Sequence, residues 1–595
     1  MNSYNAPLED MRFVLQELSD LHSLAKLPDS EALADRELTD AILDQAARFA
    51  REVLAPLDEV GDRQGARWSE QGVTTAPGFR DAYRQFVEAG WNNIGMPAEH
   101  GGQGLPMLLC AAINEVFVSS NKSFCYCPGL TAAGVKALAA GGSSSLKQQY
   151  IPKLVSGQWS ATMNLTEPQA GSDVGALRTR ALPQPDGSYR LFGQKIFISY
   201  GEHDLTENIV HLVLARIPEA PEGTKGVSLF VVPKMLADTG RPNDVRCTGI
   251  EHKLGSHGSP TCTLVYGDRG EGATGWLVGA ENKGLNTMFV MVNSARFNVG
   301  QEGIAMAERA YQQARDYAKE RIQGRLATGG GGPVPIIRHP DVRRMLLTMR
   351  CQIEAMRAVS LVLAGARDLA ARHPDAELRR EQQAFVDLMI PVFKGWASEV
   401  GIEVASMSIQ VHGGIGYVEE SGVSQPLRDV RISAIYEGTT SIQGHDLVER
   451  KLARDGGAAL RAWLGQLHQI LGELESSREA HLVVVGTRLR RAVEALQRAC
   501  DWTLANFAQR PLGVLVGSVP LLRLFGLVAG GWQMARAALA AQRLLDQGRG
   551  HENFLRAKIA SAEFYAAHLL PQAGGMAEVA VQGGDAVMAL DDAVF

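Results

Sequence analysis

Residues 163–173, MNLTEPQAGSD, stand at the point where a helix-rich N-terminal region gives way to strands. The stretch combines a hydroxyl, a proline turn and three small residues, namely Thr166, Pro168, Ala170, Gly171 and Ser172. Short hydroxyls and unobstructed backbone N–H groups can bind a flat or anionic ligand. An ordinary turn capped by Ser172 and Asp173 is the alternative, and the stretch alone favours that alternative.

The segment after residue 160 is rich in short runs of β-branched and aromatic residues. Three of these runs are SYRLFGQKIFISYG (188–201), ENIVHLVLARI (207–217) and GVSLFVVPK (226–234). Gly, Pro and Asp turns separate the runs, as in PDG at 185–187. Because such runs between turn residues are typical of strands, we expect an antiparallel β domain over residues 160–284.

Helical periodicity dominates on both sides of this β domain. It predicts a short amphipathic helix from Asp10 to Asp20 and a second helix from Leu38 to Ala55. We expect Pro56 to end the second helix. Its expected apolar face consists of Ile42, Ala46, Phe49 and Val53. Further helices are predicted over residues 285–317, 338–372, 377–411 and 440–454.

The expected fold is therefore mainly α with a central β domain. At ~150 residues per domain, the 595 residues correspond to about four domains. The expected divisions are an N-terminal extension (1–37), a helical domain (38–159), the β domain (160–284), a helical bundle (285–454) and an additional helical domain (455–595). We expect the Gly-rich insert TGGGGPVP (328–335) to form a surface loop between two helices.

The composition indicates a cytoplasmic protein that does not bind nucleic acid. The 59 basic and 65 acidic residues give a net charge of −6, which is no basic field for nucleic acid or anionic lipid. The seven cysteines are few and odd in number, which fits a reducing compartment better than a disulfide framework. The start of the chain has early acidic residues and lacks the apolar core of a signal peptide.

One apolar stretch, PLGVLVGSVPLLRLFGLVAGGWQMA at 511–535, raises the question of membrane contact. Arg523 splits it into two uncharged pieces, and each is shorter than the ~20 residues of a spanning helix. A pair of buried helices is the favoured interpretation, and contact with a membrane surface is the alternative.

Common enzyme motifs are absent from the sequence. It has no P-loop, no GxGxxG between strand and helix, no HExxH and no serine nucleophile elbow. Cys125 and Cys127 have the wrong spacing for a zinc knuckle, and we predict no metal site. A nucleotide cofactor, if bound, is therefore held outside the Rossmann scheme.

Two further segments carry candidate residues. In QVHGGIGY (410–417), Gly413 and Gly414 form either a helix C-cap or a point of close backbone approach, and the C-cap is favoured. In LRDVRISAIYEGTTSIQ (427–443), Glu437 stands in an apolar run just before Gly438. Burial raises the pKa of such a carboxyl, which suits a general base near neutral pH. An exposed glutamate beside a helix N-cap fits these residues about as well.

Seven motifs in order now resemble the flavin-dependent acyl-CoA dehydrogenases. They are TEPQAGSD (166–173), KIFIS (195–199), ENKGLN (281–286), Arg296, KERIQGR (319–325), QVHGG (410–414) and IYEGT (435–439). The resemblance covers residues 40–450 and implies an N-terminal helical domain, an antiparallel β domain and a C-terminal four-helix bundle. The long C-terminal region looks like that of the enlarged branch, which includes enzymes of the 3-methylmercaptopropionyl-CoA dehydrogenase type and broad-range bacterial fatty acyl-CoA dehydrogenases.

The resemblance implies FAD as cofactor and assigns residues to it. Those of one subunit are Met163, Leu165, Thr166, Gly171 and Ser172 beside the flavin, Phe197, Ile198 and Ser199 over its far face, and Thr439. Those that reach the FAD of a neighbouring subunit are Arg321, Gln410, Gly413 and Gly414. A homodimer is therefore expected, with a tetramer as the alternative.

The resemblance also implies the reaction, which is α,β-dehydrogenation of an acyl-CoA in fatty acid β-oxidation or a related pathway. Glu437 is the implied base, and Ala295 closes the alternative position used by some relatives. The implied substrate contacts are Ser172, Asn293, Arg296 and Gly438, although Asn293 and Ser441 depart from residues common in the family. An electron-transfer flavoprotein is the expected electron acceptor.

Two other functions share this scaffold. The first is an acyl-CoA oxidase that uses O₂, which flavin motifs do not distinguish from a dehydrogenase. The second is a non-catalytic flavin- or acyl-CoA-binding homologue, and the presence of Glu437 and a net negative charge speaks against it.

Overall fold

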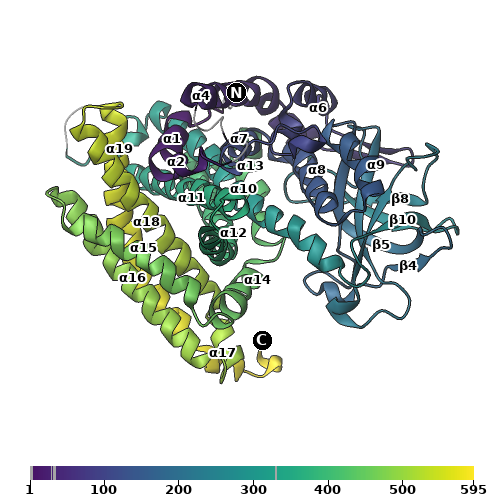
Figure 1. The fold of residues 1–595 in the computed structure, drawn as a ribbon. Coiled ribbons are helices and arrows are strands. Elements are labelled where there is room, and N and C mark those ends of the chain that lie inside the picture. Colours follow the sequence, from purple (N-terminus) through teal and green to yellow (C-terminus); the bar gives the residue numbers. More distant parts are fainter. Residues whose placement is uncertain (1–3, 28–29, 31–34, 329–331) are drawn as a thin grey trace. The chain divides into compact units, whose positions relative to one another are not determined.

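The computed structural model describes residues 4–27, 30, 35–328 and 332–595 as two compact units. Unit 1 comprises Met1–Gln45, Met107–Ser119 and Arg296–Phe595, and unit 2 comprises Ala46–Pro106 and Ser120–Ala295. Unit 1 is helical, and the strands belong to unit 2 (Figure 1). The predicted class, mainly α with a central β domain, is confirmed. Part of the predicted loop at 328–335 lies outside the described residues.

Unit 2 is built on an eight-stranded sheet. Its strands are β3 (Trp159–Asn164), β4 (Arg180–Pro183), β5 (Tyr189–Ser199), β6 (Asn208–Ala215), β7 (Ser228–Pro233), β8 (Val245–Ile250), β9 (Thr261–Tyr266) and β10 (Ala273–Val278). They lie in the order β3-β6-β7-β10-β5-β9-β8, with β4 beside β5. Every pair is antiparallel, as expected, except β3 and β6. These two run parallel because the chain between them passes through β4 and β5 and returns to the same end of the sheet.

Helices α8 (Lys122–Gly141) and α9 (Ser144–Val155) of unit 2 pack against β3. Unit 2 also contains α5 (Ala55–Gln64), α6 (Phe79–Glu88) and the small hairpin of β1 (Arg67–Ser69) and β2 (Gly72–Thr74). Leu138 of α8, Tyr150 of α9 and Leu212 of β6 are buried in one apolar core. This core fixes β3, whose C-terminal end continues into the motif at 163–173.

Pro56 does not end its helix, contrary to expectation. Helix α4 (Arg36–Phe49) continues through the π-helical turn η2 (Ala50–Leu54) into α5. Proline normally breaks a helix because its ring clashes with the carbonyl four residues earlier. Here that carbonyl lies in the wider π turn, and Pro56 itself stands in the first turn of α5.

Unit 1 is a bundle of long helices with shorter ones around it. The helices are α1 (Leu8–Phe13), α2 (Leu21–Leu24), α7 (Met107–Ser120), α10 (Gly284–Glu320), α11 (Pro340–Arg372), α12 (Ala376–His412), α13 (Gln425–Val430), α14 (Thr440–His445), α15 (Ala458–Glu475), α16 (Ala480–Asn506), α17 (Pro511–Val516), α18 (Ser518–Asp546), α19 (Glu552–Phe564), α20 (Ala573–Val581) and α21 (Gly584–Met588). Helix α10 begins in unit 2 and continues into unit 1. Helices α11 and α12 pack along each other, and α18 packs on both.

The apolar stretch at 511–535 forms two helices, the short α17 and most of α18. Pro520 stands in the first turn of α18, and Leu522, Phe525 and other apolar side chains of this helix are buried in unit 1. Figure 1 shows α18 running beside α16 and α15. Among the described residues, no helix combines the length and apolar character needed to cross a membrane.

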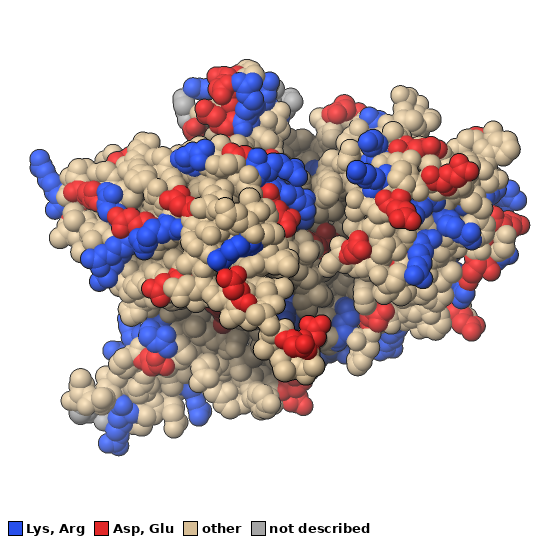
Figure 2. Space-filling model, turned by 90° about the horizontal axis from the view of Figure 1, so that it is seen from below, with Lys and Arg blue, Asp and Glu red and all other residues tan. Residues whose placement is uncertain are grey.

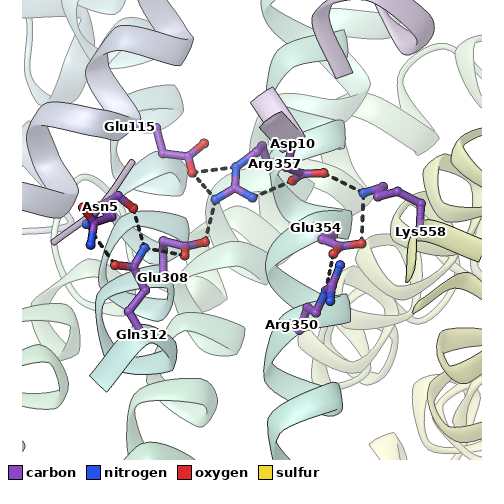
Figure 3. Close-up of polar contacts among 9 residues, drawn as sticks. All are labelled: Asn5, Asp10, Glu115, Glu308, Gln312, Arg350, Glu354, Arg357 and Lys558. Atoms are coloured by element: carbon purple, nitrogen blue, oxygen red, sulfur yellow. Dashed lines mark hydrogen bonds and ion pairs between the residues drawn. The ribbon is translucent and has the colours of Figure 1, made fainter. Parts of the chain in front are cut away.

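Buried charges join the N-terminal segment to the bundle and to the C-terminal helices (Figure 3). Arg357 of α11, 1% exposed, donates to Glu115 at 2.6 Å, to Asp10 at 2.6 Å and to Glu308 at 2.8 Å. Asp10 also accepts from Lys558 of α19 at 2.7 Å. These ion pairs hold the pKa of the Asp10 carboxyl at about 2, although burial alone raises it.

The surface carries both signs of charge. On the face shown in Figure 2, acidic and basic side chains are interspersed rather than gathered by sign. This distribution agrees with the small net charge of −6. It gives that face no field of a single sign to attract a polyanion.

Replacing Lys558 by Met is expected to lower the free energy of unfolding by about 3 kcal/mol, because it leaves Asp10 and Glu354 short of a buried partner. Urea denaturation of the full chain measures this change. The matched control is Arg556→Met, which removes an exposed ion pair with Glu552 on the same helix and is expected to change stability by less than about 1 kcal/mol. Equal effects of the two substitutions would contradict the structural importance of the buried network.

Candidate functional site

Glu437 and Gly438 form a turn with left-handed backbone at both residues. Their φ angles are +53° and +84°. A glutamate rarely adopts this conformation, and such strain persists only where the surroundings impose it. Glycine is required at 438, since an added Cβ would lie 2.7 Å from the side-chain nitrogen of Gln443. The turn leads into α14, whose N-cap is Thr439.

The residues before Glu437 are anchored to α10. The carboxylate of Glu302 accepts a hydrogen bond from Ser433 Oγ at 2.9 Å and another from the Tyr436 hydroxyl. Glu302 is itself 7% exposed, so these contacts are shielded from water. They fix the backbone that enters the left-handed turn.

Helices α12 and α14 hold the turn itself. Lys394 Nζ of α12 donates to the Gly438 carbonyl at 2.7 Å, and Gln443 Nε2 of α14 donates to the same carbonyl at 3.1 Å. One turn further along α12, Glu399 accepts from Thr440 Oγ1 at 2.6 Å. Side chains of two helices of unit 1 therefore hold the turn and the residues that follow it.

The Glu437 carboxyl has no hydrogen-bond partner among the described residues. The surrounding protein raises its pKa to about 7 by excluding water, an effect that Lys394 and Arg296 oppose and Glu302 reinforces. Its backbone N–H also makes no hydrogen bond within the described part of the chain. A proton acceptor that ionises near neutral pH and an unused N–H donor therefore belong to the same residue.

Arg296 is buried rather than exposed toward a ligand. It is 7% exposed, and its Nη1 donates to Asp446 at 2.7 Å. Its Nε is buried and has no hydrogen-bond partner. Asn293, one turn earlier on α10, is exposed and belongs to unit 2.

In unit 2, the motif at 163–173 is anchored by a buried ion pair. Glu167 accepts from Lys195 Nζ at 2.8 Å and from Thr179 Oγ1 at 2.6 Å. Lys195 also donates to the Leu165 carbonyl at 2.9 Å, and the Ile196 N–H donates to the Thr166 carbonyl at 3.0 Å. Burial alone raises the pKa of Glu167, but Lys195 and Thr179 lower it to about 2. The two motifs TEPQAGSD and KIFIS are thus joined by direct contacts.

The predicted cofactor residues of unit 2 differ in exposure. Those that are partly or fully exposed are Met163, Leu165, Thr166, Gly171, Ser172, Phe197 and Ser199. Ile198 is different, because its side chain is 2% exposed and packs in the core of the sheet. Only the backbone of Ile198 can therefore meet a ligand. The β-bulge between Lys195 and Ile198 causes this turn inward.

These residues fit a flat aromatic group such as a flavin. Phe197 is 59% exposed, with a left-handed φ of +59°, so its ring is held out from the sheet. A Cβ added at Gly171 would meet no atom within 4 Å, so the backbone there is open to a ligand. A planar group binds well where a rigidly held segment presents an exposed aromatic ring and an unobstructed backbone.

The residues predicted to reach a neighbouring subunit's cofactor come together at one end of unit 1. Tyr317 of α10 stacks on His412 of α12, with ring centroids 4.5 Å apart. This contact places Arg321, one turn beyond Tyr317, near the end of α12. Gln410, Gly413 and Gly414 are exposed there, and Gly413 is the C-cap, as predicted.

The sequence did not predict the residues that hold the turn at Glu437 or those that anchor the motif at 163–173. They are Lys394, Glu302, Gln443, Asp446 and the pair Glu167–Lys195. Lys394 gave one signal, since it is the single charge in the apolar run LMIPVFKGWAS at 388–398. The others carry no local signal because their partners are distant in the sequence.

Comparison with protein families matches four consecutive parts of the chain. The matching descriptions are acyl-CoA dehydrogenase N-terminal domain over residues 36–158, middle domain over 162–268, C-terminal domain over 282–452, and acetyl-CoA dehydrogenase C-terminal-like over 453–591.

Individual relatives match over almost the whole length. The chain is 46% identical to 3-methylmercaptopropionyl-CoA dehydrogenase of Ruegeria pomeroyi, over 98% of this chain and 99% of that protein. It is 36% identical to the broad-specificity linear acyl-CoA dehydrogenase FadE5 of Mycobacterium tuberculosis, over all of both chains. Its fold is similar to that of an acyl-CoA dehydrogenase from Bacillus anthracis solved with FAD, with a TM-score of 0.74, 22% identity and coverage of 97% and 93%.

Replacing Glu167 by Gln is expected to loosen the segment 163–173, because it leaves the ammonium of Lys195 buried without a counter-charge. We expect a loss of about 3 kcal/mol in stability and faster hydrogen exchange at the amides of residues 178 and 179, which donate to Glu167. Hydrogen-exchange mass spectrometry measures exchange in the segment 163–173 and at these two amides. Glu207→Gln, an exposed carboxylate of the same unit, is the control. Unchanged exchange in Glu167→Gln would contradict this anchoring role.

Proposed function

The chain belongs to the acyl-CoA dehydrogenase family, and we propose that it oxidises an acyl-CoA thioester to the trans-2-enoyl-CoA with Glu437 as the base. Full-length identity of 46% to a named dehydrogenase supports the reaction class. The observation that carries the assignment of the base is the unpartnered Glu437 carboxyl, whose pKa is raised to about 7 by the surrounding protein.

Glu437 takes up the α-proton of the thioester in this proposal. The α C–H is only weakly acidic, so the negative charge that develops on the carbonyl oxygen must be stabilised. The free backbone N–H of Glu437 is suited to this, because it has no other acceptor among the described residues. The rigid turn then presents the acceptor carboxylate and the donor N–H from a single residue.

FAD, when bound, supplies the acceptor for the hydride that leaves the β-carbon. The residues proposed to hold it in unit 2 are the backbone from Met163 to Ser172 and the segment Phe197–Ser199, with Ile198 contributing its backbone. Arg321, Gln410, Gly413 and Gly414 are proposed to bind the FAD of a second copy of the chain. Their exposure at one end of unit 1 supports this, and a homodimer follows from it.

The electron acceptor and location are also inferred. We propose that an electron-transfer flavoprotein, rather than O₂, accepts the electrons, as in the family that the chain belongs to. Peroxide release in air would identify an oxidase instead. All seven cysteines are free thiols, which supports a reducing compartment such as the cytoplasm. A panel of acyl-CoA thioesters from short to long chain, including the methylmercaptopropionyl thioester, would identify the substrate with an artificial acceptor.

Glu437→Gln is expected to keep FAD and to lose dehydrogenation by about a thousandfold or more, because glutamine cannot accept the α-proton. Reduction of an artificial electron acceptor measures the rate, and flavin absorbance measures the bound cofactor. The control Glu449→Gln changes an exposed carboxylate nearby and is expected to leave the rate unchanged. Wild-type turnover in Glu437→Gln would show that another group is the base.

Arg321→Ala is expected to purify with less FAD, because the variant lacks a cation proposed to contact the cofactor of the neighbouring subunit. The ratio of flavin to protein absorbance measures this loss. Arg325→Ala, four residues along the same exposed segment, is expected to retain the cofactor. Full flavin content and unchanged thermal stability in Arg321→Ala would exclude the proposed contact.

A further inference from the structure

Lys394 is a fully buried lysine on the apolar part of α12. Its side chain is 0% exposed, and its ammonium donates to the Gly438 carbonyl at 2.7 Å. Lysine is almost never fully buried unless it is paired, because removing its charge from water is unfavourable. A neutral donor such as asparagine could supply the same hydrogen bond without a buried charge. The positive charge therefore calls for its own explanation.

Four charged side chains surround Lys394. They are Glu437 from the turn, Glu302 and Arg296 from α10, and Glu399 from α12. Two of the three carboxylates have hydrogen-bond donors of their own, since Glu302 binds Ser433 and Tyr436, and Glu399 binds Thr440. Glu437 has none within the described residues.

Arg296 stabilises the ionised Glu437 carboxylate less than Lys394 does. Its guanidinium is already paired with Asp446 at 2.7 Å, so its charge is largely compensated. Lys394 accordingly opposes the rise in the Glu437 pKa more than Arg296 does. Among the described residues, Lys394 is the cation near Glu437 whose hydrogen bond goes to a carbonyl rather than to a carboxylate.

We propose that Lys394 is a positioning residue for Glu437, holding the left-handed turn through the Gly438 carbonyl and stabilising the ionised carboxylate by its charge. The inference rests on the proposed function only for its catalytic consequence. The hydrogen bond sets where the Glu437 carboxyl and N–H point. The charge sets the pH at which the carboxyl becomes able to accept a proton.

The two groups define a pH window in which both are ionised. Burial raises the pKa of Glu437 to about 7 and lowers the pKa of Lys394 to about 8. Below pH 7 the carboxyl holds a proton and cannot act as a base, so activity falls as the pH falls. Without the charge of Lys394, the carboxylate is less stable and its pKa moves further up. The acid limb of the pH–rate profile then moves to higher pH.

Three substitutions of Lys394 separate charge from hydrogen bonding in the flavin-loaded full chain. Lys394→Gln removes the charge and retains a donor, Lys394→Met removes both, and Lys394→Arg retains the charge. We expect Gln and Met to raise the midpoint of the acid limb of kcat/KM by about one pH unit, and Arg to leave it within a few tenths. If Lys394→Met fails to fold, Lys394→Gln alone is compared with the wild type.

Ser398→Ala is the matched control. Ser398 lies one turn along α12 and donates to the Ser433 carbonyl at 3.1 Å, so the variant removes a neutral contact between the same helix and the same loop. Its midpoint is expected to stay at the wild-type value even where its rate falls. A shift in Ser398→Ala equal to that in Lys394→Gln would show that loosening of the loop, not charge, moves the pKa, and would overturn the inference.

An infrared titration separates this inference from the proposed function. The carboxylic acid band that is lost in Glu437→Gln reports protonation of Glu437 whether or not it is the base. A higher midpoint of this band in Lys394→Gln supports the inference, even if Glu437→Gln stays active and the base is another group. Wild-type midpoints in both Lys394→Gln and Lys394→Met overturn it, even if Glu437 proves to be the base.

A reciprocal measurement follows the titration of Lys394 itself and leaves the charge at position 394 in place. If the two charges interact, Glu437→Gln must lower the pKa of Lys394. Carbon NMR of lysines labelled at Cε follows this titration, with Lys394→Arg identifying the signal. An unchanged Lys394 pKa in Glu437→Gln also contradicts the inference.

Discussion

A carboxyl group without a partner, carried on a strained turn, is the constraint around which this part of the protein is built. Glu437 and Gly438 both have left-handed backbone, and neither conformation would persist without support. Glu302 of α10, Lys394 of α12 and Gln443 of α14 supply that support through side chains that are themselves shielded from water. Lys394 and Gln443 bind the turn itself, and Glu302 binds the residues just before it.

Buried ion pairs also hold two other parts of the protein in place. Lys195 and Glu167 fix the exposed motif at 163–173 in unit 2, and Arg357 binds three carboxylates in unit 1. Lys558 extends the second network to the C-terminal helices. A buried ion pair adds little net stability over a well-packed apolar pair, but breaking one is costly, so such pairs select one arrangement over others. The additional C-terminal helices are thereby tied to the N-terminal segment.

Motifs with local signals were predictable from the sequence, and tertiary partners were not. The order of helices and strands, the cap at Gly413 and the N-cap at Thr439 follow from local residue patterns. The parallel pairing of β3 with β6 depends on a long return of the chain, and the inward turn of Ile198 depends on a bulge. Pro56 is tolerated because of a π turn that no residue pattern announces. Glu302 lies 134 residues from Tyr436, so its contact has no local signature.

The central claim is that Glu437 takes the α-proton of a bound thioester. A crystal structure of the flavin-loaded protein with a non-reactive acyl-CoA analogue tests this most directly, because it measures the distance from the Glu437 carboxylate to the α-carbon of the ligand. The account predicts about 3–3.5 Å, the separation of reacting atoms in a near-attack arrangement. A carboxylate that points away from the ligand, with another basic group at that distance, would contradict it.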